Sequence, residues 1–272
     1  MKYGIIPPPA RLAAFIRNFW FAEGAALQQH PYVHHAFAYT CPELIFCYKG
    51  QFRHSMSGAK EQLLVPGIYG QTQTFSKVTA TNDFGVFGFY LYPHALPQLF
   101  GLPASELTNQ VADLQTLCGK EGAMLEEKIM LAANNEERMQ YVCDFLEARL
   151  KNVSPVYLKL LPSIKLFADP RKVMSVKKLA EQNFLSVRQF ERKFKEISGF
   201  SPKMFLRIRR FNSVLNKKSN HKSLVEIAYE AGYYDQSHFI HDFRQFSGYN
   251  PKEYFKVETI AASDRGTVEF TP

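Results

Sequence analysis

An internal repeat between residues 176 and 255 constrains this chain more than any other feature of its sequence. Five spaced residues occur twice in the same order, and each member of the second set lies 49 positions after its counterpart. The first set is Phe190, Phe194, Gly199, Pro202 and Phe205, and the second is Phe239, Phe243, Gly248, Pro251 and Tyr254. Such a match without any insertion predicts two copies of one structural module.

Each copy of the repeat predicts two short helices joined by a tight turn. Ser186 and Asp235 each precede the second helix of a copy, where a side-chain oxygen satisfies amides of the first turn. Pro202 suits the first position of a further helix, because its missing amide proton has no partner to lose there. The expected helices span residues 176–185 and 187–197 in the first copy, 224–231 and 236–246 in the second, and 202–215 between them.

The positive charge of the chain is concentrated in the repeat. The net charge is +8 over the 272 residues, yet residues 169–256 alone carry 18 Lys/Arg against 9 Asp/Glu. Residues 1–168 are nearly neutral, with 14 basic and 13 acidic residues. This asymmetry indicates a polyanionic partner for the repeat only.

Paired helix-turn-helix units suit double-stranded DNA geometrically. One α-helix fits a major groove, which is about 12 Å wide. Two reading helices on one frame reach successive grooves about 34 Å apart. Arginine makes two hydrogen bonds to the edge of guanine, and glutamine makes two to the edge of adenine. Lysine side chains and the amides at helix N-termini bind phosphates.

Several short segments of the repeat resemble the AraC/XylS family of bacterial transcription regulators. The residues that carry the resemblance are Ile227-Ala228, Ala231-Gly232-Tyr233, Asp235-Gln236-Ser237-His238-Phe239, Phe243-Arg244 and Gly248-Tyr249-Asn250-Pro251. The resemblance implies two helix-turn-helix subdomains and control of transcription, commonly as an activator, with RNA polymerase as a further partner. The N-terminal segments 8–20, 43–48 and 102–117 look like the sensor-like domain of one branch of this family.

The resemblance also assigns roles to individual side chains. It implies that bases are read by Arg188, Glu191 and Arg192 in the first module and by Gln236, Ser237 and His241 in the second. The phosphate contacts expected with them are Ser186, Lys193, Lys195, Lys203, Arg209, Arg210, His238 and Arg244.

The N-terminal part predicts a separate β-rich domain. Short apolar runs such as residues 44–48 and 86–91 alternate with turn signals over residues 32–91, which is typical of an antiparallel jelly roll. Residues 12–20 are expected to form a short amphipathic helix running into a strand. The fold class expected for the chain is therefore α+β, with a cupin-like domain, a helical connector and an all-α domain. The expected boundaries are 1–95, 96–167, 168–256 and a tail of 257–272.

The role of the connector is left open between two alternatives. Apolar stripes at helical spacing run through residues 119–150. They dock either on the β domain or on a second copy of the chain, so a homodimer is possible.

The β domain offers candidates for a ligand but not for a metal. Tyr48, Phe87 and Phe89 are candidate pocket residues for a small-molecule effector, although aromatic residues in strands are more often core. Five histidines lie in this region, but neighbouring His34 and His35 point to opposite faces of a strand, and no His-x-His occurs. We expect no metal, no cofactor and no catalytic residues.

Two other classes of protein were weighed against a regulator. A metal-dependent jelly-roll oxygenase with a DNA-binding tail needs clustered ligands, and a repair methyltransferase needs an activated cysteine, whereas Cys41, Cys47, Cys118 and Cys143 lie in no such motif. A non-specific architectural DNA-binding protein remains open. Without a signal peptide or a long apolar run, we expect a cytoplasmic protein with no membrane partner.

Overall fold

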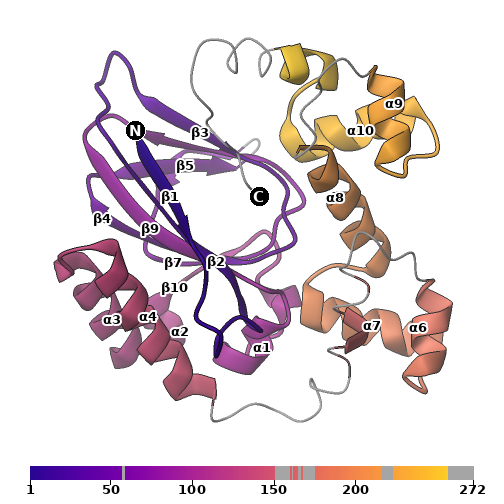
Figure 1. The fold of residues 1–272 in the computed structure, drawn as a ribbon, viewed down its shortest axis with the longest axis horizontal. Coiled ribbons are helices and arrows are strands. Elements are labelled where there is room, and N and C mark those ends of the chain that lie inside the picture. The colour runs from indigo at the N-terminus through magenta and orange to yellow at the C-terminus, as the bar shows by residue number, and fades with distance from the viewer. Residues whose placement is uncertain are drawn as a thin grey trace.

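A β-rich N-terminal domain lies beside an all-helical C-terminal domain in the computed structural model (Figure 1). The structure describes residues 1–56, 59–150, 160, 162–164, 167, 175–215 and 223–256. The α+β fold class predicted from the sequence is confirmed.

The N-terminal domain contains two antiparallel sheets. The six-stranded sheet has the order β1-β2-β9-β4-β7-β10, and the four-stranded sheet has the order β3-β8-β5-β6. The strands are β1 (Lys2–Ile6), β2 (Ile16–Gly24), β3 (Tyr32–Ala36), β4 (Glu43–Lys49), β5 (Phe52–Met56), β6 (Gln62–Leu63), β7 (Gly67–Tyr69), β8 (Ser76–Ala80), β9 (Phe84–Leu91) and β10 (Val111–Asp113). Residues 10–15 form turns before β2 rather than the predicted helix, and Phe19 and Trp20 pair with β9 as strand residues.

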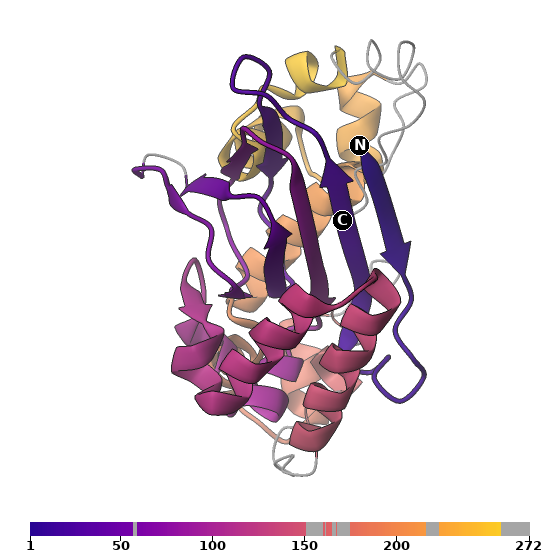
Figure 2. The ribbon, with the colours of Figure 1, turned by 90° about the vertical axis from the view of Figure 1, so that its left-hand side faces the viewer.

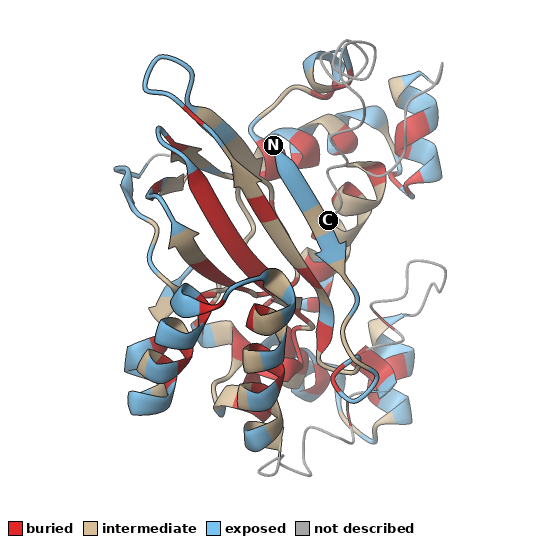
Figure 3. Ribbon diagram, turned by 60° about the vertical axis from the view of Figure 1, so that its left-hand side comes forward, coloured by how far each residue is buried: buried red, intermediate tan, exposed pale blue. Residues whose placement is uncertain are grey.

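The six-stranded sheet is covered on both faces, which explains the nearly continuous apolar runs of its central strands. In β4, Leu44 and Phe46 point to the helical layer, while Ile45 points to the four-stranded sheet. Figure 3 shows the resulting stripe of buried residues along the central strands.

Helices cover the outer face of the six-stranded sheet (Figure 2). They are α1 (Ala95–Phe100), the 3-10 helix η1 (Ala104–Glu106), α2 (Leu114–Cys118), α3 (Lys120–Leu131) and α4 (Asn135–Arg149). Leu125 and Ile129 of α3 and Val142 and Leu146 of α4 share one core with Leu44. Of the two alternatives for the apolar stripes, docking on the β domain is therefore the one observed. The region predicted as a connector also contributes β10, which pairs with β7.

The C-terminal helices follow the repeat. They are α6 (Val176–Gln182), α7 (Val187–Ser198), α8 (Pro202–Leu215), α9 (Leu224–Glu230) and α10 (Gln236–Ser247), followed by a helical turn over residues 251–256. Phe190 and Phe194 of α7 and Phe239 and Phe243 of α10 are at most 1% exposed and form the centre of the helical core. The predicted boundary after residue 167 adjoins residues 168–174, which lie outside the described residues, as does the tail 257–272. In the part of the chain that the structure describes, no helix is both long and apolar enough to cross a membrane.

Candidate nucleic-acid interface

The two helix-turn-helix units place α7 and α10 in equivalent positions. Ser186 accepts the amide of Gln189 at 3.2 Å, and Asp235 accepts the amide of His238 at 2.8 Å. At the other end of the helices, Gly199 and Gly248 adopt left-handed φ angles of 82° and 78°. The repeat therefore fixes the beginning and the end of both reading helices.

All six residues predicted to read bases are exposed. Arg188, Glu191 and Arg192 lie on the solvent side of α7, opposite the buried Phe190 and Phe194. The same holds on α10, where the exposed positions are Gln236, Ser237 and His241. All six belong to the first seven residues of their helices, which is the part of a recognition helix that contacts base edges.

The predicted phosphate contacts divide into two groups. Solvent-exposed members are Ser186, Lys195, Lys203, His238 and Arg244, and Lys193 is half-buried. Arg209 and Arg210 are instead engaged within the domain, so their prediction as phosphate ligands needs correction. Arg209 donates to the carbonyl of Phe167 at 2.6 Å, and Arg210 stacks 5.0 Å from the ring centre of Tyr233. Helical spacing cannot distinguish these inward arginines from outward ones, because α8 has partners on several sides.

A buried ion pair that sequence reasoning missed joins α8 to α10. Asp242 is 5% exposed, and its Oδ1 accepts from Arg207 Nε at 3.1 Å and from Nη2 at 2.6 Å. Arg207 Nη2 also donates to Gln245 at 2.8 Å. The only sequence signal is an acidic residue beside the inward Phe243, because the two partners lie 35 residues apart.

The N-terminal domain touches the C-terminal end of α7. Gln71 is fully buried, and its amide nitrogen donates to Ala104 at 2.6 Å and to Thr108 at 2.7 Å. A Cβ atom placed on Gly199 would lie 1.5 Å from that same nitrogen. The Thr108 hydroxyl in turn donates to the carbonyl of Gly199 at 2.9 Å.

The N-terminal domain also touches the equivalent end of α10. A Cβ atom on Gly248 would lie 2.7 Å from the ring of Phe75. The amide of Ala38 donates to the carbonyl of Phe246 at 2.9 Å, and the ring of Phe37 packs edge-on against Tyr254 at 5.8 Å. We call the contacts of both ends the domain seam, made by residues 37–38, 71–75 and 104–108 with Gly199, Phe246 and Gly248. The seam holds the C-terminal ends of both reading helices and leaves their first turns exposed.

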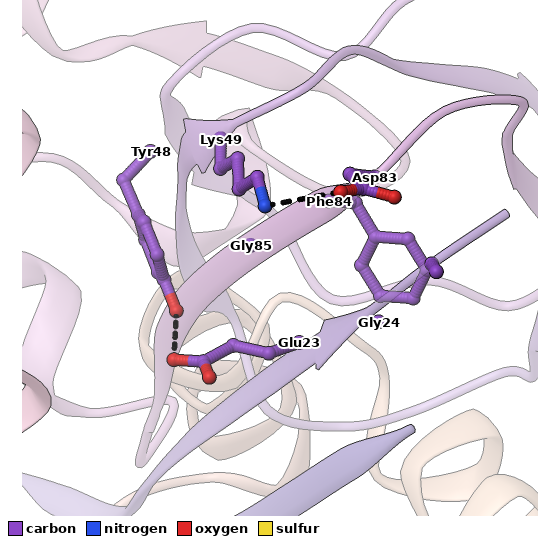
Figure 4. Close-up of a pocket in the computed structure, with 8 residues that line it drawn as sticks. Glu23, Gly24, Tyr48, Lys49, Asp83, Phe84 and Gly85 are labelled. Atoms are coloured by element: carbon purple, nitrogen blue, oxygen red, sulfur yellow. Dashed lines mark hydrogen bonds and ion pairs between the residues drawn. The ribbon is translucent and has the colours of Figure 1, made fainter.

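A pocket of about 300 Å³ opens at one end of the β domain (Figure 4). Its polar side chains pair with one another, because Tyr48 donates to Glu23 at 2.6 Å and Lys49 lies 3.3 Å from Asp83. Of the three predicted pocket residues, Tyr48 borders this pocket. Phe87 and Phe89 are 0% exposed and pack against Phe19 under the helices, so they are core and not pocket lining.

The histidines of the β domain that the structure describes contact different neighbours and do not form a cluster. His94 binds the carbonyl of Ala14 at 2.8 Å, His35 packs against Tyr249 at 5.3 Å, and His54 packs against Tyr69 at 5.8 Å. Within the described ranges, no group of three His, Cys, Asp or Glu side chains is placed to hold a metal ion.

Two family models match the chain. Residues 179–256 match a helix-turn-helix domain, and residues 5–113 match a domain of unknown function, DUF6597. An uncharacterized HTH-type transcriptional regulator of Haemophilus influenzae is 30% identical over 98 residues. That alignment covers 36% of this chain and 33% of the relative, so the chain spans about a third of the length of the relative it matches.

Solved structures with similar folds have low sequence identity to this chain. ToxT from Vibrio cholerae is 12% identical, with a TM-score of 0.47 over 88% of this chain and 98% of ToxT. The DNA-binding domain of AdpA, solved in complex with a target DNA, is 19% identical, with a TM-score of 0.33 over 41% of this chain and 99% of AdpA's domain. The matched model, the repeat and the capped reading helices agree on one assignment: residues 179–256 of this chain form a helix-turn-helix domain of the AraC type.

Proposed function

We propose that this chain is a sequence-specific DNA-binding transcriptional regulator whose N-terminal domain binds a small-molecule effector. The observation that carries the proposal is the pair of repeat-related reading helices, with six exposed side chains in their first two turns. The surplus of basic residues in the same region supports a polyanionic partner.

The spacing of the two units fits successive major grooves. Helix α8 has 14 residues, which corresponds to a length of about 21 Å. A reading helix packs near each end of α8 in Figure 1, and each helix is about 10–12 Å in diameter. These two lengths together come to about one duplex turn, which is about 34 Å, and this agreement supports reading helices in successive major grooves.

The domain seam supports a route from an effector to DNA. Because residues 71–75 lie against Gly199 and also against Gly248, any shift of this loop acts on both reading helices together. Interfaces of this kind are bistable when two packings differ by a few kcal/mol. An effector that prefers one packing then changes DNA affinity by its differential affinity for the two packings.

Binding to promoter DNA tests the proposal directly. We expect fluorescence anisotropy with a labelled duplex from upstream of the neighbouring genes to give a Kd well below that for random sequence, with affinity falling steeply as salt rises. A footprint should protect two major-groove segments about 10 base pairs apart. Equal affinity for promoter and random DNA would instead indicate an architectural protein, and no salt-sensitive binding would overturn the proposal.

The remaining parts of the proposal concern the cellular setting. We infer that the regulator acts in the cytoplasm, contacts RNA polymerase and has no catalytic activity. A homodimer could not use Leu125, Ile129, Val142 and Leu146 of the α3 and α4 stripes, because those are buried against the six-stranded sheet.

A further inference from the structure

The two faces of the six-stranded sheet are packed to different degrees. On the face under the helices, Leu44, Phe46 and Phe87 are at most 1% exposed. On the face toward the four-stranded sheet, side chains near the start of β4 are only half-buried; they are Trp20, Glu43, Cys47, Tyr69 and Tyr90. Solvent therefore reaches parts of these side chains, whereas it does not reach those on the opposite face.

The strand register surrounds one carboxyl group on this face with aromatic rings. Glu43 lies directly opposite Tyr90 on β9 and opposite Tyr69 on β7, so both tyrosines share its face. The ring of Trp20 lies across Gly88, where a Cβ atom would be 2.7 Å from the ring. Tyr39 packs edge-on against Tyr90 at 5.2 Å. We call Trp20, Tyr39, Glu43, Tyr69 and Tyr90 the Glu43 site.

The carboxyl group of the Glu43 site lacks a partner of opposite charge among the described residues. Its Oε1 atom is covered and has no well-formed hydrogen bond, and the only described hydrogen-bonding neighbours of the carboxyl group are the neutral side chains of Tyr90 and Trp20. Arg17 is nearby, but its guanidinium binds the hydroxyl of Tyr39 and stacks 5.6 Å from that ring. A covered carboxylate whose neighbours are all neutral is unfavourable, so the group is stabilised by taking up either a proton or a cation.

We propose that the Glu43 site binds the ammonium group of a small organic cation. Aromatic faces attract such a cation through their quadrupoles, and a carboxylate among them supplies the opposite charge. This inference rests on the proposed function, since it names the chemical class of the effector. An anionic ligand would be repelled by the ionised form of Glu43, and a neutral apolar ligand would offer that form no compensating charge. In the pocket of Figure 4, by contrast, the polar groups already satisfy one another.

The only tryptophan of the chain lies in the Glu43 site, so its fluorescence reports binding. The probe is choline, and the comparison ligand is 3,3-dimethyl-1-butanol, which has the same shape without the charge. We expect a saturable change in emission with choline and at least a tenfold weaker response with the neutral alcohol. Equal responses to both compounds, or no response to choline, would overturn the proposal.

Two variants locate the cation. Glu43→Gln keeps the shape of the side chain and removes its charge, and we expect it to weaken choline binding at least tenfold. Asp83→Asn is the matched control, because Asp83 is an exposed carboxylate paired with Lys49 at the pocket of Figure 4. Its choline affinity should equal that of the wild type. A folded Glu43→Gln protein with wild-type affinity, or loss of binding in Asp83→Asn, would contradict the assignment.

The pH dependence of the wild type gives a test that needs no variant. Burial raises the pKa of Glu43 to about 8, so choline must displace a proton at neutral pH. We expect the choline affinity to rise about tenfold per pH unit up to pH 8 and then to level off. The pKa values of the other groups around this face are shifted away from pH 8. Burial raises the pKa values of Tyr39, Tyr69, Tyr90, Cys41 and Cys47, lowers those of His34 and His54, and leaves Arg17 charged. A flat profile between pH 6 and pH 8 would contradict the cation assignment.

Measuring DNA binding on the same samples separates the two proposals. A protein that binds promoter DNA but ignores choline retains its function as a regulator and loses only the cation site. A protein that binds choline through Glu43 without binding promoter DNA keeps the cation site and loses the proposed function.

Discussion

The two helix-turn-helix units share one backbone plan and differ in the charge of their equivalent positions. Arg188, Arg192 and Lys193 on α7 correspond to Ser237, His241 and Asp242 on α10, 49 residues further on. The first unit therefore presents cations to solvent, whereas the second directs an anion inward to Arg207. From this comparison we expect the first unit to supply most of the attraction for DNA, whereas in the second unit the acidic position joins α10 to α8.

The largest effect is expected at the buried ion pair of the second unit. Asp242→Ala leaves the Arg207 guanidinium without its carboxylate, and breaking a buried pair costs about 3–5 kcal/mol of unfolding free energy. Lys193→Ala at the equivalent position of α7 should change it by less than about 0.5 kcal/mol. Urea denaturation of both variants measures the difference. Similar values for the two would show that the units are held to α8 equally.

Two glycines with nearly the same φ angle should differ in how much stability an alanine substitution costs, because only one of them lies in the domain seam. Gly199→Ala places a non-glycine residue in the left-handed region, and its Cβ atom would overlap the Gln71 amide. We therefore expect the free energy of unfolding to fall by about 3 kcal/mol. Gly232→Ala is the matched control, since its φ is 81° and the nearest neighbour of a Cβ atom lies 4.0 Å away. It should lose only about 1 kcal/mol.

The ring of Phe75 lies against Gly248, so the effect of the seam on the second unit can be tested in the same way. Gly248→Ala should be partly rescued by Phe75→Ala, because the smaller side chain removes the clash. Thermal unfolding of the single and double variants gives the coupling energy. Strict additivity would mean that Phe75 does not press on α10.

Base reading should depend more on the first unit. Arg192→Ala is expected to weaken promoter binding by about 1–3 kcal/mol, as for one lost base contact. His241→Ala, at the equivalent position, should lose less, because a single imidazole forms fewer hydrogen bonds than a forked guanidinium. Anisotropy titrations at one fixed salt concentration measure both. A larger loss in His241→Ala would reverse the assignment of the two units.

The helix caps give the smallest expected difference, and it depends on pH. Ser186→Ala should cost about 1 kcal/mol at any pH, since a hydroxyl cap does not titrate. The pKa of Asp235 is lowered below its ordinary 3.8, mainly because its carboxylate accepts the backbone amide of His238. The stability that the Asp235 cap contributes is therefore fully present above pH 3.8. It is lost as the pH falls through the lowered pKa of the folded state.

Amide hydrogen exchange compares the first turns of α7 and α10. We expect α10 to lose protection in acid while α7 keeps it. Equal loss in both helices would show that the cap of Asp235 contributes nothing specific.

Local signals in the sequence predicted the C-terminal domain well and the contacts between distant segments poorly. The caps Ser186 and Asp235 and the terminal Gly199 and Gly248 marked the reading helices to within about two residues, because such signals act over one turn. Phe87 and Phe89 were misread as pocket residues, since both faces of a doubly covered sheet are apolar. The seam and the Arg207–Asp242 pair join residues far apart in the chain, so no periodicity reveals them.

Residue 38 meets residue 246 through a hydrogen bond between main-chain atoms. A hydrogen bond between two main-chain groups does not depend directly on the side chains at those positions. Side-chain substitutions elsewhere on the two domains can therefore leave this hydrogen bond in place. Proline at position 38 is the one natural replacement that deletes the donor itself. Two domains joined in this way can each change their surface chemistry while keeping the same main-chain contact.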